Sequence, residues 1–422
     1  MSRILFKYGI LFYVLLTIMP GCKKGNDNRT QDPTPSTETI NAIIISTYSL
    51  NRGTGVTGIT VFENNGTIRW KKPGRGNPQD GYSAYGDGIL FSSEYNTSGV
   101  NTLYAYNINT GAELWSKSNT NEYYYYPIVR NDTLFCSTKN SSSTYGNIVA
   151  FNAKTGALYW TKQIAYPYWP VYLLLDGNNL FFIVTVSSTD SRVASFDITT
   201  RTINWVSSTL GINLASTFSK IAASSNRIIV TTGTKLLVAF DRNTGTVAWS
   251  KPGIPFNQPI IKDNLVYSVC SFDSYYPSDE SLWGLYAFDV TTGNQVWKSK
   301  KINYDGGSPS IYGSVIFHCG MIGGNTKDYY FMKAYNIITG SEIWNKNTGS
   351  TDYSDLCRAP VAVGNRVFAF KPNSGIDDKS RIVGYDAVSG QPKDSIVLTD
   401  ETLGKIIIAG SSGNSYTPYN SF

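Results

Sequence analysis

The chain has 422 residues, of which 41% are hydrophobic and 14% aromatic, and its formal net charge is +6. A charge this mild gives no reason to expect a nucleic-acid partner. Its 30 tyrosines and nine tryptophans, against four methionines, suit strands and stacking surfaces better than helices, so the composition predicts an all-β protein. Length alone allows one large domain or two ordinary ones.

Residues 1–21 are typical of an export signal. Two basic residues, Arg3 and Lys7, precede an apolar run at residues 10–19. This run of about ten residues is half of the roughly 20 that a spanning helix needs. The segment ends in IMPGC, which resembles the lipobox of bacterial lipoproteins and implies cleavage before Cys22 and acylation of that cysteine. An ordinary signal peptide followed by an incidental cysteine is the alternative.

Residues 22–39 are polar, rich in Pro and Thr, and without an apolar period, which predicts a lipidated, flexible tether. Residues 40–422 are then expected to form a single folded domain. Removal of the signal takes away two basic residues and no acid, so the net charge falls from +6 to +4.

An internal repeat of roughly 45 residues dominates the rest of the sequence. One phrase, of which LVAFDRNTGTVAW is a copy, recurs around a tryptophan at intervals of 44–48 residues. The seven tryptophans are Trp70, Trp115, Trp160, Trp205, Trp249, Trp297 and Trp344. An eighth, degenerate copy, IVGYDAVSGQPKD, has no tryptophan.

Each phrase predicts a hairpin, because a period-2 strand leads through a polar turn with Thr-Gly into a second strand. The Asn or Asp that begins each turn can cap turn N–H groups, so its recurrence is interpreted as structural. These residues are Asn107, Asn152, Asp197, Asp241, Asp289, Asn336 and Asp386. Glycine supplies a positive φ. Arg201 takes its place in the fourth copy, which predicts a strained turn or one of another type.

A second hairpin precedes each phrase, as in SKIAASSNRIIVTT, so that each repeat supplies the four strands of a propeller blade. Eight repeats predict an eight-bladed β-propeller of four-stranded antiparallel blades, whereas a β-solenoid would need shorter repeats. The first copy lacks its opening strand, and residues 405–413, KIIIAGSSG, match that strand of the fifth copy. We therefore expect a C-terminal strand to complete blade one, which closes the ring and hides both sheet edges. The last nine residues stay unassigned.

The AFD-x-x-TG-x-x-x-W phrase resembles the repeat of the quinoprotein-like, or PQQ-type, β-propeller family over nearly all of residues 40–412. That family includes quinone-dependent alcohol dehydrogenases. It also includes non-enzymatic lipoproteins, such as the propeller subunit of the outer-membrane β-barrel assembly machine, which this chain resembles more. The resemblance implies that the seven tryptophans are docking residues packed between blades.

The enzymatic branch, as the resemblance implies, needs a vicinal disulfide under the quinone, a Ca²⁺ site and a catalytic aspartate. This sequence has no adjacent cysteines, because Cys136, Cys270, Cys319 and Cys357 fall in separate regions. We interpret these cysteines as buried free thiols and leave a disulfide between Cys319 and Cys357 open. The lone His318 cannot build a histidine metal site and is interpreted as a strand residue. No catalytic residue, metal or cofactor is therefore expected.

The two faces of the predicted propeller differ. Turns between first and second and between third and fourth strands open on one face, here called the short-turn face, and are minimal. The opposite, long-loop face carries connections of up to about a dozen residues, lengths that are uncommon without functional cause. Aromatic residues concentrate in these connections and are candidate binding residues. They are Tyr124, Tyr125, Tyr126, Tyr168, Trp169, Tyr275, Tyr276, Trp283, Tyr304, Tyr329 and Tyr330, with Tyr123, Tyr166 and Tyr353 beside them.

These features favour a binding or scaffolding lipoprotein over an enzyme. The expected location is the bacterial cell envelope, at the outer membrane, with Cys22 as the lipid anchor. One hypothesis is a protein partner in the envelope. A second is a glycan or another small ligand at the aromatic face, and a quinone-dependent oxidoreductase comes third. The alternative to all three is that the aromatic loops only make an exported surface soluble.

Overall fold

The computed structural model of the chain describes nineteen stretches, residues 39–48, 58–73, 83–95, 100–119, 122–140, 145–164, 170–187, 190–208, 221–232, 236–251, 258–270, 280–300, 304–305, 308–323, 328–351, 359–371, 380–398, 402–410 and 415–416. Their regular structure is all strand apart from one short 3-10 helix, η2 (Glu280–Leu282). Within these stretches no helix has the length and apolar character needed to cross a membrane.

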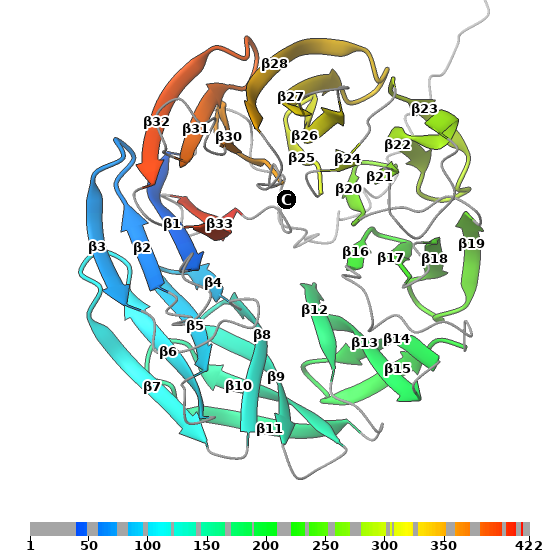
Figure 1. The fold of residues 1–422 in the computed structure, drawn as a ribbon. Coiled ribbons are helices and arrows are strands. Elements are labelled where there is room, and N and C mark those ends of the chain that lie inside the picture. The colour runs from blue at the N-terminus through cyan, green and yellow to red at the C-terminus, as the bar shows by residue number, and fades with distance from the viewer. Residues whose placement is uncertain are drawn as a thin grey trace, which may run out of the picture.

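The strands form eight sheets that stand as blades around a ring (Figure 1). Blade one contains β3 (Ile68–Pro73), β2 (Gly58–Phe62), β1 (Ile40–Tyr48), β33 (Thr402–Gly410) and β34 (Ser415–Tyr416). Blade two contains β4 (Ser83–Gly86), β5 (Ile89–Tyr95), β6 (Asn101–Asn107) and β7 (Glu113–Asn119). Blade three contains β8 (Glu122–Arg130), β9 (Thr133–Asn140), β10 (Gly146–Asn152) and β11 (Leu158–Ile164). Blade four contains β12 (Val171–Asp176), β13 (Asn179–Ser187), β14 (Asp190–Asp197) and β15 (Thr202–Val206).

The second half of the ring repeats this plan. Blade five contains β16 (Ile221–Ala223), β17 (Arg227–Thr231), β18 (Leu237–Asp241) and β19 (Val247–Lys251). Blade six contains β20 (Ile260–Lys262), β21 (Leu265–Cys270), β22 (Gly284–Asp289) and β23 (Gln295–Lys298). Blade seven contains β24 (Tyr304–Asp305), β25 (Ser310–Tyr312), β26 (Val315–Gly323), β27 (Asp328–Asn336) and β28 (Glu342–Thr351). Blade eight contains β29 (Val361–Val363), β30 (Arg366–Lys371), β31 (Ser380–Asp386) and β32 (Pro392–Leu398).

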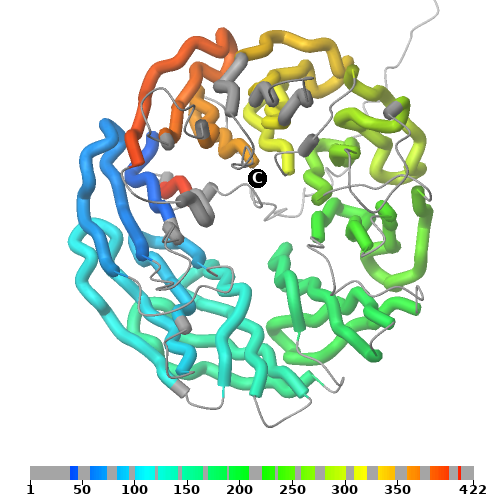
Figure 2. Tube along the Cα trace, viewed as in Figure 1, coloured from blue at the N-terminus to red at the C-terminus, as the bar shows by residue number. Residues whose placement is uncertain are grey.

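The predicted eight-bladed propeller of four-stranded antiparallel blades is confirmed. Each blade runs from an inner strand near the axis to an outer strand on the circumference, and the chain goes around the ring once (Figure 2). In blade two the short turns meet on one face, since the backbone N–H of Ile108 donates to the carbonyl oxygen of Gly88 at 3.0 Å. Blades three to eight have the corresponding contact, so this face is the predicted short-turn face.

The Asn or Asp that begins the turn in seven of the eight repeats caps that turn, as expected. The Oδ1 atom of Asn107 accepts hydrogen bonds from the backbone N–H groups of Asn109 and Thr110, at 2.9 and 3.1 Å. The six other Asn and Asp residues make the same pair of contacts. In the fourth copy, the N–H groups of Thr200 and Thr199 hold the pKa of Asp197 below its ordinary value. These side chains are therefore structural.

The repeated tryptophans dock between blades, as the resemblance implied. The indole N–H of Trp115 donates to the carbonyl oxygen of Ala153 in the next blade, at 2.9 Å. Five other tryptophans make the equivalent contact. Under each of these six rings lies the turn glycine of the following blade: a Cβ atom added at Gly156 would stand 2.7 Å from Trp115. Glycine is thus needed both for the positive φ and for the room under the indole.

Arg201 keeps the same turn type as the glycines it replaces. Its φ is +60°, and its backbone N–H donates to the carbonyl oxygen of Asp197 at 2.8 Å, as in the glycine turns. Its guanidinium carbon lies 5.8 Å from the ring centroid of Trp160, within cation–π range. The prediction of a strained turn is therefore correct and that of another turn type is wrong.

We expect Gly245→Ala to lower the free energy of unfolding by about 2–4 kcal/mol. The left-handed backbone at φ +71° costs about 1 kcal/mol for alanine, and a Cβ atom 2.4 Å from Trp205 adds about 1–3 kcal/mol of overpacking. Gly177→Ala is the matched control, because Gly177 has φ +58° and nothing within 4 Å of its Cβ position. Denaturant unfolding of both variants separates the two costs. Equal losses of unfolding free energy in the two variants would show that Trp205 tolerates a Cβ atom at position 245.

A β-bulge, which the sequence analysis did not predict, precedes the docking position in all eight blades. In blade two Ala105 pairs with Trp115 and Tyr106 pairs with Glu113, so that Leu114 has no partner. The other seven outer strands shift register at the same point. A bulge twists the strand and makes its free edge a poor template for pairing with another chain. The bulges therefore protect the outer edges of the blades.

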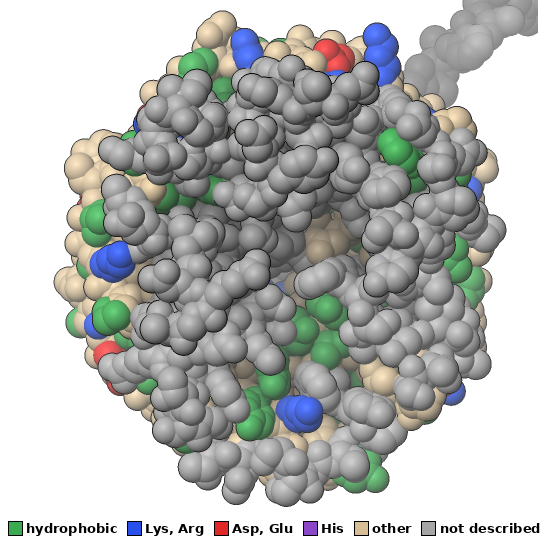
Figure 3. Space-filling model, in the orientation of Figure 1, with side chains coloured by type: hydrophobic (Ala, Val, Ile, Leu, Met, Phe, Trp, Pro, Cys, Tyr) green, Lys and Arg blue, Asp and Glu red, His purple; other side chains and the backbone are tan. Residues whose placement is uncertain are grey.

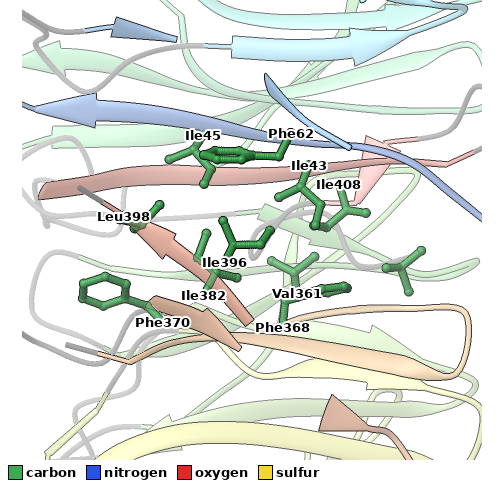
Figure 4. Close-up of a cluster of buried hydrophobic side chains, with 11 residues drawn as sticks. Ile43, Ile45, Phe62, Val361, Phe368, Phe370, Ile382, Ile396, Leu398 and Ile408 are labelled. Atoms are coloured by element: carbon green, nitrogen blue, oxygen red, sulfur yellow. The ribbon is translucent and has the colours of Figure 1, made fainter. Parts of the chain in front are cut away.

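The core of the described residues consists of eight clusters, each shared by two neighbouring blades. Figure 4 shows the cluster between blades eight and one, where Phe368 and Ile382 meet Ile43. Because every blade buries both of its faces against neighbours, stability depends on a complete ring.

The C-terminal strand closes the ring as predicted. β33 pairs with β1, with Ile408 opposite Ile43, and β34 adds two further residues of the unassigned tail to this blade. Blade eight has Asp394 in place of a tryptophan, and the Asp394 carboxylate lies 2.9 Å from the guanidinium of Arg366. The same guanidinium donates a hydrogen bond to Asn64 of blade one at 2.8 Å. The shared strand and this polar link take the place of tryptophan docking at the closure.

Candidate functional site

The predicted aromatic residues other than Trp283 divide into three groups. Tyr168, Trp169, Tyr275 and Tyr276 lie outside the described residues, as do Tyr166 and Tyr353. Tyr304 lies on β24, and Tyr329 and Tyr330 lie on β27 opposite Ile322 and Met321. Tyr123–Tyr126 lie on β8, the innermost strand of blade three. The expectation that these last two groups stand in loops is wrong, because the strands extend further toward the long-loop face than the sequence pattern indicated.

Tyr124 and Trp283 are not exposed binding residues. Tyr124 is 6% exposed, and its ring meets Phe151 edge to face at 6.0 Å. Its backbone N–H donates to Asn101 at 2.8 Å, and burial raises the pKa of its phenol to about 12. Trp283 is 8% exposed and belongs to the cluster between blades five and six. Both side chains fill the inter-blade core, so their assignment to an exposed aromatic surface is corrected.

Four half-buried tyrosines of blades three and four form the inner tyrosine cluster: Tyr123, Tyr125, Tyr126 and Tyr172. The ring centroids of Tyr123 and Tyr125 are 6.3 Å apart, and those of Tyr125 and Tyr126 are 6.4 Å apart. The contact between Tyr126 and Tyr172 joins the two blades, with centroids 5.0 Å apart and planes at 47°. In Figure 3 hydrophobic side chains gather near the centre of the ring, over β8 and β12.

The backbone under this cluster is unusual. Tyr126 has φ +50° and Tyr172 has φ +55°, values that favour glycine over residues with bulky side chains. Each lies at a register shift of its inner strand, between Tyr125 and Ile128 on β8 and between Val171 and Leu174 on β12. Such conformations cost about 1–3 kcal/mol each and cluster at active sites, ligand clamps and switch regions.

Tyr172 was missed by the sequence analysis. It stands in the run VYLLL, which reads as an ordinary inner strand of alternating side chains. The bulge that turns its ring toward Tyr126 is set by pairing with β13, and a short apolar run carries no sign of it.

The cysteines and the histidine are core residues. Cys136, Cys270 and Cys319 are buried thiols, as predicted, whereas Cys357 lies outside the described residues. Burial raises the pKa of the Cys136 thiol far above its ordinary value, which makes it a poor nucleophile. His318 is fully buried on β26, opposite Lys333.

The residues present do not fit the quinone site of the related dehydrogenases. The sequence lacks the adjacent cysteines that the resemblance implies under a quinone. Among the described residues, no three His, Cys, Asp or Glu side chains stand together in a way that could hold a metal ion.

Fold and packing define a closed eight-bladed propeller whose blades are docked through repeated tryptophans. The protein family described as outer membrane protein assembly factor BamB matches residues 57–171 and 189–404, well over half of the chain. The chain therefore belongs to this family. No curated protein matches the sequence.

Solved structures share the fold at low sequence identity. The computationally designed Ika8 protein is 13% identical, with a TM-score of 0.55 over 82% of this chain and 98% of that one. A europium-containing methanol dehydrogenase is 13% identical, with a TM-score of 0.50 over 84% of each chain. BamB from Moraxella catarrhalis is 15% identical, with a TM-score of 0.48 over 90% of this chain and 99% of that one. At such identities the first two support the fold alone.

Proposed function

We propose that this protein is a lipid-anchored scaffold of the bacterial cell envelope, at the outer membrane, and that it binds a protein partner and catalyses no reaction. The long-loop face is the binding surface, with the inner tyrosine cluster near its centre. Membership of a family described as an assembly factor supports a protein partner. The observation that carries the proposal is the cluster itself, in which two tyrosines on adjacent innermost strands hold strained backbones and bring their rings 5.0 Å apart.

Tyrosines suit such a role, because they offer large contact area at low entropic cost and a polar tip. The half-buried rings of Tyr123 and Tyr125 lie on the same strand, two residues apart, so that one partner could cover both. The inner tyrosine cluster thus supplies the aromatic anchors that dominate the energy of many interfaces.

Tyr123→Ala combined with Tyr125→Ala is expected to weaken partner capture at least tenfold, because losing a hot-spot anchor costs about 2 kcal/mol or more. The native protein is first crosslinked in intact envelopes to identify its partner. The affinity for that partner is then compared between the native protein, the double variant and a control variant. Tyr159→Ala is the control, since Tyr159 is 50% exposed but stands on outer strand β11. Normal capture by the double variant, with loss in the control, would place the binding surface elsewhere.

A glycan or another small ligand is the second candidate for the same surface. Rings of the inner tyrosine cluster lie 5.0–6.4 Å from one another, a spacing at which several rings could contact one sugar face. A glycan-binding screen of the mature protein tests this function. Binding that disappears in the Tyr123 and Tyr125 double variant would favour it over the protein partner.

Cys22 is proposed as the lipid anchor, on the basis of the charged start, the short apolar run and the Gly21-Cys22 junction. Cys22→Ser is expected to release the protein from membranes or to leave an uncleaved precursor, because the thiol that carries the lipid is gone. Metabolic labelling with a fatty acid followed by membrane fractionation measures both effects. Label retained by the variant would rule out this anchor.

A further inference from the structure

The fold leaves the N-terminal segment on the short-turn face. β1 begins at Ile40, opposite Gly410, and Asn41 accepts a hydrogen bond from Arg69 beside the turn of β2 and β3. That turn is one of the short turns, so a chain arriving from Cys22 reaches the propeller on this face. The predicted tether, as a coil of about 18 residues, would span roughly 23 Å on average. The short-turn face is therefore the one held near the lipid.

The turns of this face are polar except in two neighbouring blades. Two residues after the capping Asn or Asp, five copies have polar residues: Asn109, Lys154, Thr199, Asn243 and Thr291. Blades seven and eight have Ile338 and Val388 there instead, each 67% exposed. The two turns are neighbours, since the indole N–H of Trp344 in blade seven donates to the carbonyl oxygen of Ala387 at 3.2 Å. A further apolar side chain, that of Ile343, lies on β28 after the blade-seven turn and is 45% exposed.

We infer that Ile338 and Val388 insert into the surface of the bilayer that holds the anchor, so that the propeller rests on blades seven and eight with its long-loop face turned away. This inference rests on the proposed lipid anchor. Insertion buries the exposed apolar tips in lipid, close to the point where the tether arrives. It also leaves the inner tyrosine cluster facing away from the bilayer, where a protein partner can bind it.

Charge near the two tips favours a lipid surface over an acidic partner. Lys393 pairs with Asp386 at 2.7 Å, and Arg366 pairs with Asp394 at 2.9 Å. These two basic groups are already neutralised, and Lys346, whose side chain lies beside Gly390 of the blade-eight turn, is one further basic group there. Apolar burial therefore supplies most of the contact energy. Insertion should therefore occur on zwitterionic vesicles and change little with salt.

The test uses the lipidated full-length protein in phosphatidylcholine vesicles, with Cys357→Ser to remove the thiol outside the described residues. An environment-sensitive fluorophore is attached to Ile338→Cys or Val388→Cys. Thr199→Cys, at the same turn position of blade four, is the matched control on the opposite side of the ring. Lys300→Cys, beyond β23 on the long-loop side, reports on the other face.

We expect emission at positions 338 and 388 to shift to shorter wavelength on vesicles and to be quenched by spin-labelled lipid, with much smaller changes at 199 and 300. Unchanged emission at 338 and 388 of vesicle-bound protein would overturn the inference and leave the anchor intact. A larger response at 300 would reverse the orientation, and equal responses at 338, 388 and 199 would refute the choice of blades. Shifts that grow with protein concentration without vesicles would assign the tips to a second copy. Protein that carries no lipid would refute the anchor, and the inference with it.

Discussion

Deletion of residues 404–422 is expected to leave the domain unfolded at temperatures at which the full chain is folded. The deletion removes nearly all of β33, whose Ile407 and Ile408 are buried in the clusters shared with blades two and eight. Each buried isoleucine contributes about 2–5 kcal/mol, and the hydrogen bonds to β1 are lost as well. Because a whole domain is stable by only about 5–15 kcal/mol, little stability would remain. Thermal unfolding followed by circular dichroism measures the loss.

Deletion of residues 411–422 is the matched control. It retains β33 and removes β34, which pairs only through Ser415 and Tyr416. We expect a small change in the melting temperature, because the ladder between β1 and β33 survives. If the longer deletion also left the melting temperature unchanged, the ring would have to close without the C-terminal strand.

Trp115→Ala is expected to lower the free energy of unfolding by about 3 kcal/mol, the lower end of the range for truncating a large aromatic side chain, because the indole is half-buried. The indole fills the space between Phe91 and Phe151, with ring centroids 5.9 and 6.4 Å away, and its N–H bonds to Ala153. Its removal opens a cavity between blades two and three. It also leaves the carbonyl oxygen of Ala153 without that donor. Denaturant unfolding at equilibrium measures the loss.

Leu114→Ala controls for a change in the same strand. Leu114 is 44% exposed and occupies the bulge next to Trp115, so its truncation should cost less than about 1 kcal/mol. Neither change touches the inner tyrosine cluster, and residual folded protein should therefore still capture its partner. Equal losses in the two variants would show that the bulge, and not the docking contact, holds the blades together.

Features encoded within one repeat were predictable from the sequence. The repeated phrase predicts a hairpin, a capping Asn or Asp and a docking tryptophan. Because the docking tryptophan recurs seven times, the pattern is distinguishable from chance. The closing strand was predictable for the same reason, since residues 405–413 match an opening strand that blade one lacks. Arg201 shows the limit: the sequence indicated strain, but the retained turn type follows from its hydrogen bond to Asp197.

The sequence by itself determined the class of fold, the number of blades and the way the ring closes, because these follow from local periodicity repeated eight times. Tertiary structure alone decided which of the predicted aromatic residues are buried in the core and which are not. Tyr124 and Tyr125 are neighbours in one tyrosine run, yet the first packs against Phe151 and the second joins the inner tyrosine cluster. Successive residues of a strand point to opposite faces of the sheet, which explains why Tyr124 and Tyr125 differ. The bulges at Tyr126 and Tyr172 shift this alternation for the residues beside them. Those bulges depend on pairing with adjacent strands, which no local pattern records.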